Sequence, residues 1–284
     1  RGYDGLNTSG TTRVEQPTVE GQKFSPKGLL TWNASERWSF TAALAKAYRF
    51  ATAAELYQLV STGTTFTSPN PNLKPDNVTS AELRVERKFE RARLQLSLFQ
   101  DDVHDAIISQ FNTLNGSTQL YSFVSNVDHV RARGAELAFG TNDVLLQGLA
   151  FSGNVTAVDP KTLAMSGRAS ATAAPDAAID KQLPNIPKWR ATATAMYRPN
   201  ERFTYTLAGR YSSKLYTTLD NADVRYNTYQ GFSEWFVMDT KANFRVNENW
   251  STSLGVDNLL DRKYFLFHPF PQRTFLASLK YGFQ

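Results

Sequence analysis

Few residues in this chain have the types and spacing that catalytic or redox chemistry requires. None of the 284 residues is cysteine, so disulfide frameworks, zinc–thiolate sites and cysteine nucleophiles are excluded. The three histidines, His104, His129 and His268, are far apart in the sequence, and none has a partner at ligand spacing. No serine lies in the glycine-flanked turn that presents a catalytic serine. We therefore expect no catalytic residue, no enzymatic activity and no cofactor.

One compact acidic cluster remains. Asp101, Asp102 and Asp105 surround His104, where a predicted strand passes into a long loop. Oxygen ligands of this kind can hold a divalent cation. A solvated loop edge is the simpler interpretation, and we assign no metal site.

The elements that position these residues alternate with the period of β-strands. Near the end of the chain, Phe275 and Leu279 share one face of a strand, and Ser278 and Lys280 share the other. An apolar face opposite a polar face suits a strand between lipid and a wet interior. The same alternation predicts eleven strands, and residues 1–4 resemble the end of one more. The eleven are 24–34, 38–48, 78–89, 92–101, 130–139, 145–157, 187–198, 202–213, 234–246, 250–258 and 272–283.

Short polar turns and long loops alternate between these strands. The short turns, most of them flanked by aromatic residues, lie at Ser35, Glu90, Asn142, Asn200 and Glu248. The long connections are 49–77, 102–129, 158–186, 214–233 and 259–271, and several exceed the ~12–15 residues usual in a compact soluble domain. Short turns at one end and long loops at the other are typical of the periplasmic and extracellular ends of an outer-membrane barrel.

Composition agrees with a barrel and excludes a helical membrane protein. Aromatic residues make up 13% of the chain, mean hydropathy is −0.41, and no run approaches ~18 apolar residues. The net charge of +5 is scattered along the chain, so we predict no nucleic-acid-binding patch. A soluble all-β sandwich or propeller would also alternate. The regular turn rhythm, with paired aromatics at the short turns alone, favours the membrane barrel.

Several motifs occur in a fixed order. They are AYRFATAAELYQL (47–59), NPNLKPDNVTSAELRVE (70–86), VRARGAELAF (130–139), and GVDNLLDRKYF (255–265) followed by a C-terminal strand that ends in Phe283. Together, over residues 20–284, they resemble the C-terminal barrel motifs of TonB-dependent outer-membrane receptors. Asp76 stands where that family carries glutamate, and Gln284 follows the aromatic on which the family usually ends. NPNLKP and 258–261 also have a purely structural interpretation as turns.

The resemblance implies an all-β fold, a transmembrane antiparallel β-barrel. Eleven or twelve strands cannot form the whole of a barrel that in the family has 22, because open edges are not tolerated in lipid. Residues 1–284 are therefore expected to be the C-terminal part of the barrel, its second half. We also expect that the plug domain and the segment that contacts TonB are absent from this chain.

The resemblance also implies a function. We expect a receptor in the outer membrane of a Gram-negative bacterium that imports a ferric siderophore or a similar scarce nutrient, energised through the TonB complex. Its other partners would be outer-membrane lipid and lipopolysaccharide, which a cation at the acidic cluster could bridge. Two alternatives stay open: a passive 12-stranded porin-like channel whose last strand comes from residues 1–23, and a soluble all-β binding module.

Ligand contacts in such a receptor should come from loop aromatics and arginine, because flat and cationic groups suit bulky, often anionic iron chelates. The candidates are Tyr57, Phe66, Tyr121, Phe123, Arg225, Tyr226 and Tyr229. The alternative is that these rings pack the loops together. At the C-terminus, the resemblance implies that Leu279, Tyr281 and Phe283 form the assembly signal of the last strand.

The alternation assigns side chains to the two faces of the wall. Those predicted to face lipid are Leu94, Leu96, Leu98, Phe203, Tyr205, Leu207, Phe275, Leu279 and Tyr281. Those predicted to face inward are Arg84, Glu86, Lys188, Arg190, Arg210, Lys241 and Lys280.

Overall fold

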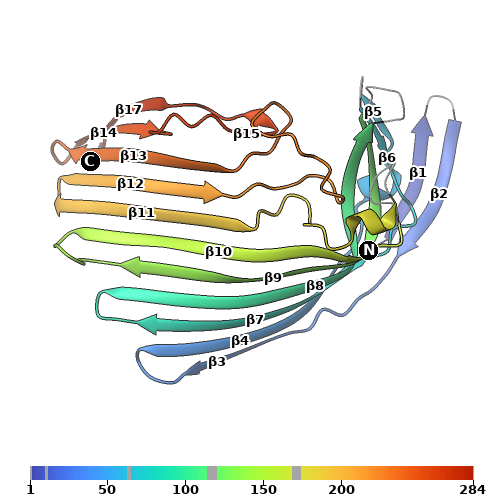
Figure 1. Ribbon diagram of the computed structural model, residues 1–284, viewed down its shortest axis with the longest axis horizontal. Helices are drawn as coiled ribbons and strands as arrows, with labels where there is room; N and C mark the ends of the chain where they lie inside the picture. The colour runs from blue at the N-terminus through green and yellow to red at the C-terminus, as the bar shows by residue number, and fades with distance from the viewer. Residues whose placement is uncertain (1, 10–11, 63–64, 114–119, 168–173, 284) are drawn as a thin grey trace.

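The computed structural model describes residues 2–9, 12–62, 65–113, 120–167 and 174–283 (Figure 1). Within these ranges the fold is almost entirely β, with one short α-helix, α1 (Ala53–Tyr57), and one 3₁₀ turn, η1 (Pro175–Ala178). No helix of the described ranges is long and apolar enough to cross a membrane.

Eleven antiparallel strands form one continuous sheet, which we call the wall. All eleven predicted strands are confirmed. Their bounds are β3 (Lys27–Asn33), β4 (Trp38–Arg49), β7 (Asp76–Lys88), β8 (Ala92–Thr113), β9 (Leu120–Thr141), β10 (Leu149–Ala164), β11 (Trp189–Asn200), β12 (Phe203–Ser212), β13 (Trp235–Arg245), β14 (Trp250–Asp257) and β17 (Thr274–Tyr281). In the described residues, β3 and β17 are the edges of this wall, and each pairs with a single neighbour.

Strands β8 and β9 are much longer than the alternation predicts. Each has 22 residues, and their ladder continues to the pair Thr113 and Leu120. The segments predicted as loop are rich in β-branched and aromatic residues, which favour strands. The pairing is interrupted at Asp105, whose φ of 54° lies in the left-handed region, and the ladder resumes beyond it in the same register.

Several smaller strands lie beside the wall. Strands β1 (Gly2–Ser9) and β2 (Thr12–Glu20) form a separate hairpin, and in the described residues neither pairs with the wall. The strand end predicted at 1–4 is therefore part of this hairpin. The described residues of this stretch, 2–9 and 12–23, do not supply the twelfth wall strand that the porin-like alternative requires. Strand β6 (Thr65–Ser68) pairs with β5 (Val60–Thr62) and, in parallel, with β9; β15 (Phe265–Leu266) pairs with β16 (His268–Pro269).

The short turns and the long loops lie at opposite ends of the wall, as predicted. Figure 1 shows the turns β3–β4, β7–β8, β9–β10, β11–β12 and β13–β14 together at the left end, because alternate connections of an antiparallel meander fall on the same side. Helix α1, β5 and β6 lie at the right end, which we call the loop end. The assignment of the two ends to periplasm and cell exterior stays a prediction.

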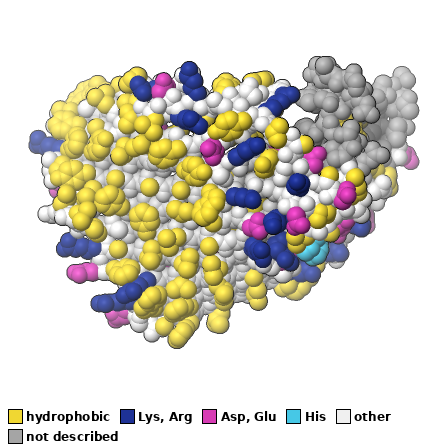
Figure 2. Space-filling view, in the orientation of Figure 1, with side chains coloured by type: hydrophobic (Ala, Val, Ile, Leu, Met, Phe, Trp, Pro, Cys, Tyr) yellow, Lys and Arg dark blue, Asp and Glu magenta, His cyan; other side chains and the backbone are white. Residues whose placement is uncertain are grey.

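The register separates an apolar face from a polar face. Leu96 is paired with Val85 on one side and Leu137 on the other, and this row lies on what we call the outer face. Its neighbour Ser97 is paired with Arg84 and Glu136 on the inner face. Figure 2 shows hydrophobic side chains spread across the middle of the wall, with charged side chains toward both ends and histidine toward the loop end. Contact of the outer face with lipid stays a prediction.

Candidate functional site

The long loops are packed against the wall rather than extended into solvent. One small core joins α1 and its flanking segments to β9, and it consists of Ala51, Leu56, Tyr57, Leu73 and Val124. A second core joins β8–β10 to the segments around η1, and it includes Val127, Val130, Met165, Leu183 and Leu219. Buried apolar contacts of this kind hold the loops in a defined arrangement.

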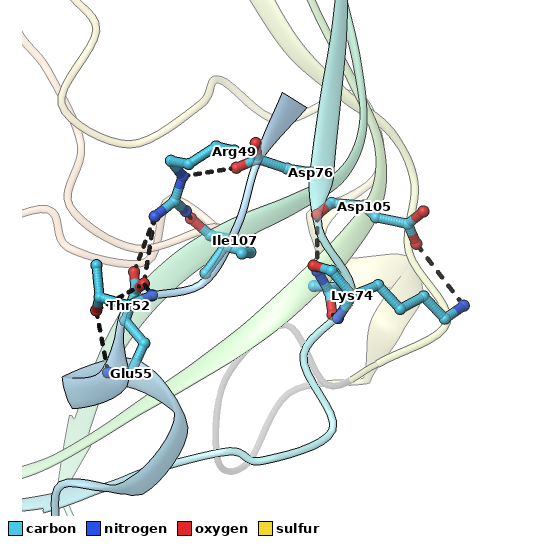
Figure 3. A network of polar contacts seen from close by, with 8 residues as sticks. Arg49, Thr52, Glu55, Lys74, Asp76, Asp105 and Ile107 are labelled. Carbon is cyan, nitrogen blue, oxygen red and sulfur yellow. Dashed lines mark hydrogen bonds and ion pairs between the residues drawn. The ribbon is translucent and has the colours of Figure 1, made fainter. Parts of the chain in front are cut away.

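Arg49, at the end of β4, joins three loop-end segments (Figure 3). Its Nε donates to Asp76 Oδ2 at 2.8 Å, its Nη1 to Glu55 Oε1 at 3.0 Å, and its Nη2 to the carbonyl oxygen of Ile107 at 3.0 Å. Thr52 caps α1, because its hydroxyl accepts from the Glu55 N–H while Glu55 Oε2 accepts from the Thr52 N–H. This geometry gives the AYRFATAAEL motif a structural role.

The charge of Glu55 is stabilised by these donors. Burial by itself would raise the pKa of the Glu55 carboxyl. Hydrogen bonds from the Thr52 backbone, from Arg49 and from the Thr52 hydroxyl outweigh it and hold the pKa below its ordinary value. The carboxylate is therefore ionised wherever the cap is formed at neutral pH.

The NPNLKP segment (70–75) is held in place by hydrogen bonds from asparagine side chains, in agreement with its structural interpretation as a turn. Asn70 accepts from the N–H of Asn72 and donates to the carbonyl oxygen of Val124. Asn126 accepts from the N–H of Lys74 at 2.9 Å and donates to the Lys74 carbonyl oxygen at 3.0 Å. The segment is thereby fixed to β9, and the side-chain amides of Asn70 and Asn126 are bonded to backbone groups.

The predicted ligand-contact residues fall in three separate places. Tyr57 is 5% exposed, and its hydroxyl donates to the Pro17 carbonyl oxygen at 2.6 Å. Its ring therefore packs in the loop core, which is the alternative role considered for it. Tyr121 and Phe123 on β9 stack with ring centroids 5.5 Å apart. The backbone of Phe66 pairs with that of Tyr121, and the Phe66 side chain lies outside what the structure describes.

The remaining three candidates lie in the loop between β12 and β13. Arg225 Nη1 donates to Gln230 Oε1 at 2.8 Å, while Tyr226 and Tyr229 are 49% and 52% exposed. The Tyr229 ring lies 5.9 Å from that of Phe267 and 5.4 Å from that of His268, in the loop before β17. We call Tyr226, Tyr229, Phe267 and His268 the loop aromatic cluster.

The sequence analysis missed the part that Phe267 and His268 play in this cluster. The signal available was the density of rings in FLFHPF (265–270), within the predicted loop 259–271. Asn258 holds that loop, because its side chain accepts from the Arg262 N–H and donates to the carbonyl oxygens of Arg262 and Pro271. The structural interpretation of residues 258–261 is thereby confirmed.

Two histidines that are far apart in the sequence meet in the fold. His104 on β8 and His129 on β9 are directly paired, and their rings stack at 4.3 Å. Asp102 Oδ1 lies 2.9 Å from His129 Nε2 and accepts from Arg131 Nε at 2.7 Å. The residues are side by side because antiparallel register brings together positions 25 apart in the chain.

The acidic cluster of the sequence is divided by the pleat of β8. Asp101 accepts from the Ser80 hydroxyl on the inner face, whereas Asp102 lies on the outer face. Asp105 Oδ1, where the β8–β9 pairing is interrupted, is 3.8 Å from Lys74 Nζ. Over the described ranges, no three His, Asp or Glu side chains form a group that could hold a metal ion.

Two other features, a hollow and a group of aromatic rings, lie away from the loops. A hollow of about 690 Å³ lies at the short-turn end, lined by residues that include Arg93, Asn142 and Met196; it is remote from the loop aromatic cluster. At the C-terminus the Tyr281 ring contacts those of Trp250 and Phe283, at 4.8 and 4.9 Å. Phe283 is 91% exposed.

Comparisons with known proteins agree with this architecture. The family model for the β-barrel of TonB-dependent-receptor-like proteins matches residues 2–259. A curated protein of Acinetobacter baumannii, "Probable TonB-dependent siderophore receptor PiuA", is 32% identical over 89 residues, which are 30% of this chain and 10% of that protein.

Solved structures share the fold. The ferric-catecholate import receptor Fiu from K12 E. coli matches with a TM-score of 0.71 and 20% identity over 98% of this chain and 38% of that chain. A variant of the ferric enterobactin receptor PfeA from Pseudomonas aeruginosa matches with a TM-score of 0.66 and 18% identity over 91% of this chain and 40% of that chain. The chain thus spans about two fifths of the length of these two structures.

Proposed function

This chain belongs to the TonB-dependent receptors, and we propose that it is part of an outer-membrane barrel that imports a ferric siderophore or a similar scarce nutrient. Residues 1–284 are the C-terminal part of the barrel in this proposal. The plug domain and the segment that contacts TonB belong to the rest of a longer protein. Energy for import comes through TonB, as it does for the family.

The observation that carries the proposal is the eleven-stranded wall with two unpaired edges in the described residues, β3 and β17. In hydrocarbon each unpaired backbone N–H or C=O costs several kcal/mol, so a wall with an apolar outer face has to be closed by further strands. A soluble sandwich would cover one face of the wall with a second sheet. Here the outer side chains of β14 and β17, including Leu254 and Leu279, are 63% and 68% exposed.

The loop aromatic cluster is the ligand surface we propose. Exposed rings, with a guanidinium on the same loop at Arg225, suit a bulky chelate that carries aromatic groups and negative charge. Arg225 and the two tyrosines come from one loop and Phe267 and His268 from another. A ligand that touches both would bridge two loops that Asn258 and the loop cores already hold in place. The inner-face charges, such as Arg84 and Glu86, line a wet interior in this proposal.

The C-terminal strand serves assembly in the same proposal. Leu279, Tyr281 and Phe283 follow one another on the outer side of β17 and just beyond its end, and their rings and side chains are exposed. Amphipathic rings at this position would anchor the strand at the membrane interface. The outer-membrane insertion machinery would recognise this strand.

The test is iron uptake by the full-length receptor in a Gram-negative host that lacks its other ferric siderophore receptors. Uptake of an iron–catecholate chelate should require the receptor and should stop when TonB is deleted. Arg225→Gln with Tyr229→Ala should weaken chelate binding about tenfold, since each contact contributes about 1 kcal/mol. Val224→Ala, which truncates an exposed side chain of the same loop, is the matched control. TonB-independent diffusion of chelates and sugars alike would contradict import and favour a passive channel.

A further inference from the structure

The loop between β12 and β13 contains a segment, residues 224–230, that we call the arm. It carries three of the proposed ligand contacts, Arg225, Tyr226 and Tyr229. Every side chain of the arm is exposed, and that of Val224 is 71% exposed. Side chains that are not packed in a core do little to fix the backbone that carries them. The position of the arm therefore depends on the contacts at its two ends.

The C-terminal end of the arm is bonded to the loop before β17. The Gln230 N–H donates to the Phe267 carbonyl oxygen at 2.7 Å, and the Phe267 N–H donates to the Gly231 carbonyl oxygen at 3.0 Å. Ser233, which is 1% exposed, accepts from the Asn227 N–H at 2.9 Å. These bonds join the two loops of the loop aromatic cluster through their backbones.

The N-terminal end of the arm is linked to a third loop, the one between β10 and β11, by the side chain of Asn221. Asn221 Oδ1 accepts from the Gln182 N–H at 2.9 Å. Asn221 Nδ2 donates to the carbonyl oxygens of Gln182 at 2.9 Å and Thr218 at 3.1 Å. Gln182 is in turn paired with Lys161 of β10. The side chain of Asn221 thus connects the start of the arm, through one residue of a neighbouring loop, to the wall.

The turn that holds Asn221 has other supports of its own. Leu219 is 1% exposed and lies in the second loop core. Asp223 accepts from the Thr217 N–H at 2.6 Å within the same turn. Removal of the Asn221 side chain should therefore loosen the contact between the two loops, which we call the joint, without unfolding the turn.

We propose that Asn221 is a positioning residue for ligand binding, which does not touch the ligand but sets the arm that presents Arg225, Tyr226 and Tyr229. This inference rests on the proposed function, because it requires the loop aromatic cluster to bind the chelate. A loose arm has to be ordered when the ligand binds, and that entropic cost lowers the affinity. The loop between β10 and β11 contributes none of the proposed ligand contacts, yet it would control affinity through the backbone of Gln182.

The test begins with Asn221→Gly in the full-length receptor. Asn221 has a φ of 54°, in the left-handed region. Glycine adopts this conformation without strain, so the substitution removes the side-chain bonds and keeps the backbone conformation accessible. A second variant, Asn221→Asp, keeps the acceptor for the Gln182 N–H and loses both donated bonds. Heat-modifiable mobility first shows that each variant is folded.

Asn185→Gly is the matched control. Asn185 lies at the same joint, has a φ of 62°, and donates its N–H to the Tyr216 carbonyl oxygen at 2.7 Å, a bond that glycine retains. Its side chain is exposed and forms no hydrogen bond with the residues that the structure describes. The control therefore makes the same substitution at the same joint without removing a contact between the loops.

Affinity for the iron–catecholate chelate and the kinetics of its uptake are measured for all variants. Asn221→Gly should bind about tenfold more weakly, which corresponds to about 1.4 kcal/mol, because hydrogen bonds between the loops are lost. The KM of uptake should rise by a similar factor while the maximal rate stays unchanged, since the ligand contacts themselves are intact. Asn221→Asp should lie between wild type and Asn221→Gly. Asn185→Gly should stay within about twofold of the wild type.

Hydrogen exchange of residues 222–230, measured without ligand, reports on the joint directly. The amides of the arm should exchange at least about fivefold faster in Asn221→Gly than in the wild type, whereas the amides of β11–β13 should be unaffected. Asn185→Gly should leave both sets of rates unchanged.

Four results would overturn the inference. They are unchanged exchange in the arm of Asn221→Gly, faster exchange with an unchanged KM, an equal loss of affinity in Asn185→Gly, and a lower maximal rate with an unchanged KM, which would give Asn221 a role in folding alone. The same measurements separate this failure from that of the proposed function. Normal uptake by the wild type with an unchanged KM in Asn221→Gly rejects the positioning role alone, and absence of uptake by the wild type rejects the receptor.

Discussion

Leu254 and Leu276 offer a matched test of which face of the wall meets lipid. Leu254 on β14 is paired with Ala277 of β17, and the neighbouring pair joins Gly255 to Leu276. The two leucines therefore lie at nearly the same height on adjacent strands. They point to opposite faces, because Leu254 shares the outer face with Val256 and Leu276 shares the inner face with Lys280. Both are well exposed, at 63% and 51%.

The expected cost follows from the depth of Leu254. It lies four residues from Trp250, the ring that marks the short-turn rim of β14, or about 13 Å along the strand. With strands tilted by about 40°, this places Leu254 about 10 Å inside an apolar band ~25 Å tall, close to its middle. Arginine there should cost about 2–4 kcal/mol. Leu276→Arg on the inner face should cost less than about 1 kcal/mol, because its guanidinium remains in water.

The assay is reversible urea unfolding of the full-length receptor in lipid vesicles, followed by tryptophan fluorescence. Leu254→Arg should shift the folding equilibrium at least about 30-fold further than Leu276→Arg, which corresponds to about 2 kcal/mol. Equal costs for the two variants would refute the assignment of faces. A larger cost for Leu276→Arg would mean that the faces are exchanged.

Four further predictions concern the wall, the loops and the C-terminus. Leu96→Arg should also cost about 2–4 kcal/mol in the same assay if Leu96 lies near the bilayer midplane, and an unchanged stability would contradict its outer position. Because the pKa of Glu55 is held below its ordinary value of 4.5, its contribution to the α1 cap is complete above that pH and is lost as the pH falls through the lowered value. Hydrogen exchange of the α1 amides, corrected for intrinsic rates, should thus accelerate between about pH 5 and about pH 2, and Glu55→Gln should abolish this dependence. Asn126→Ala leaves the Lys74 backbone groups without their partner and should cost about 1–3 kcal/mol, with faster proteolysis at 70–75 as the readout and an unchanged cleavage pattern as the contrary result. Phe283→Ala should lower the amount of heat-modifiable barrel in outer-membrane fractions, relative to wild type and to a deletion of Gln284, without changing chelate affinity per inserted molecule; equal insertion would leave β17 as an ordinary strand.

The period of the side chains was enough to predict the wall. Alternation is local, so Leu94, Leu96 and Leu98 reveal a strand and its faces whatever the partner is. Turn chemistry is local as well, which is why the structural roles of Asn70 and Asn258 could be predicted from Asn and Pro in short polar runs. The same locality explains the largest error. The extension of β8 and β9 depends on their mutual pairing. Beyond Leu98 the outer positions of β8 are the polar Gln100, Asp102 and His104, so the alternation of apolar and polar residues that the prediction follows ends there.

By itself, then, the sequence determined the eleven strands, their two faces, the order of short turns and long loops, and the family resemblance. Only the tertiary structure decided which distant residues meet. Register set His129 beside His104, loop packing brought Phe267 to Tyr229, and the same packing buried Tyr57. The same register places Lys46 of β4, Arg131 and Arg133 of β9, and Lys161 of β10 on one outer surface. Side-chain periodicity is a local property that can be predicted from neighbouring residues, whereas a site depends on contacts between residues that lie tens of positions apart in the sequence.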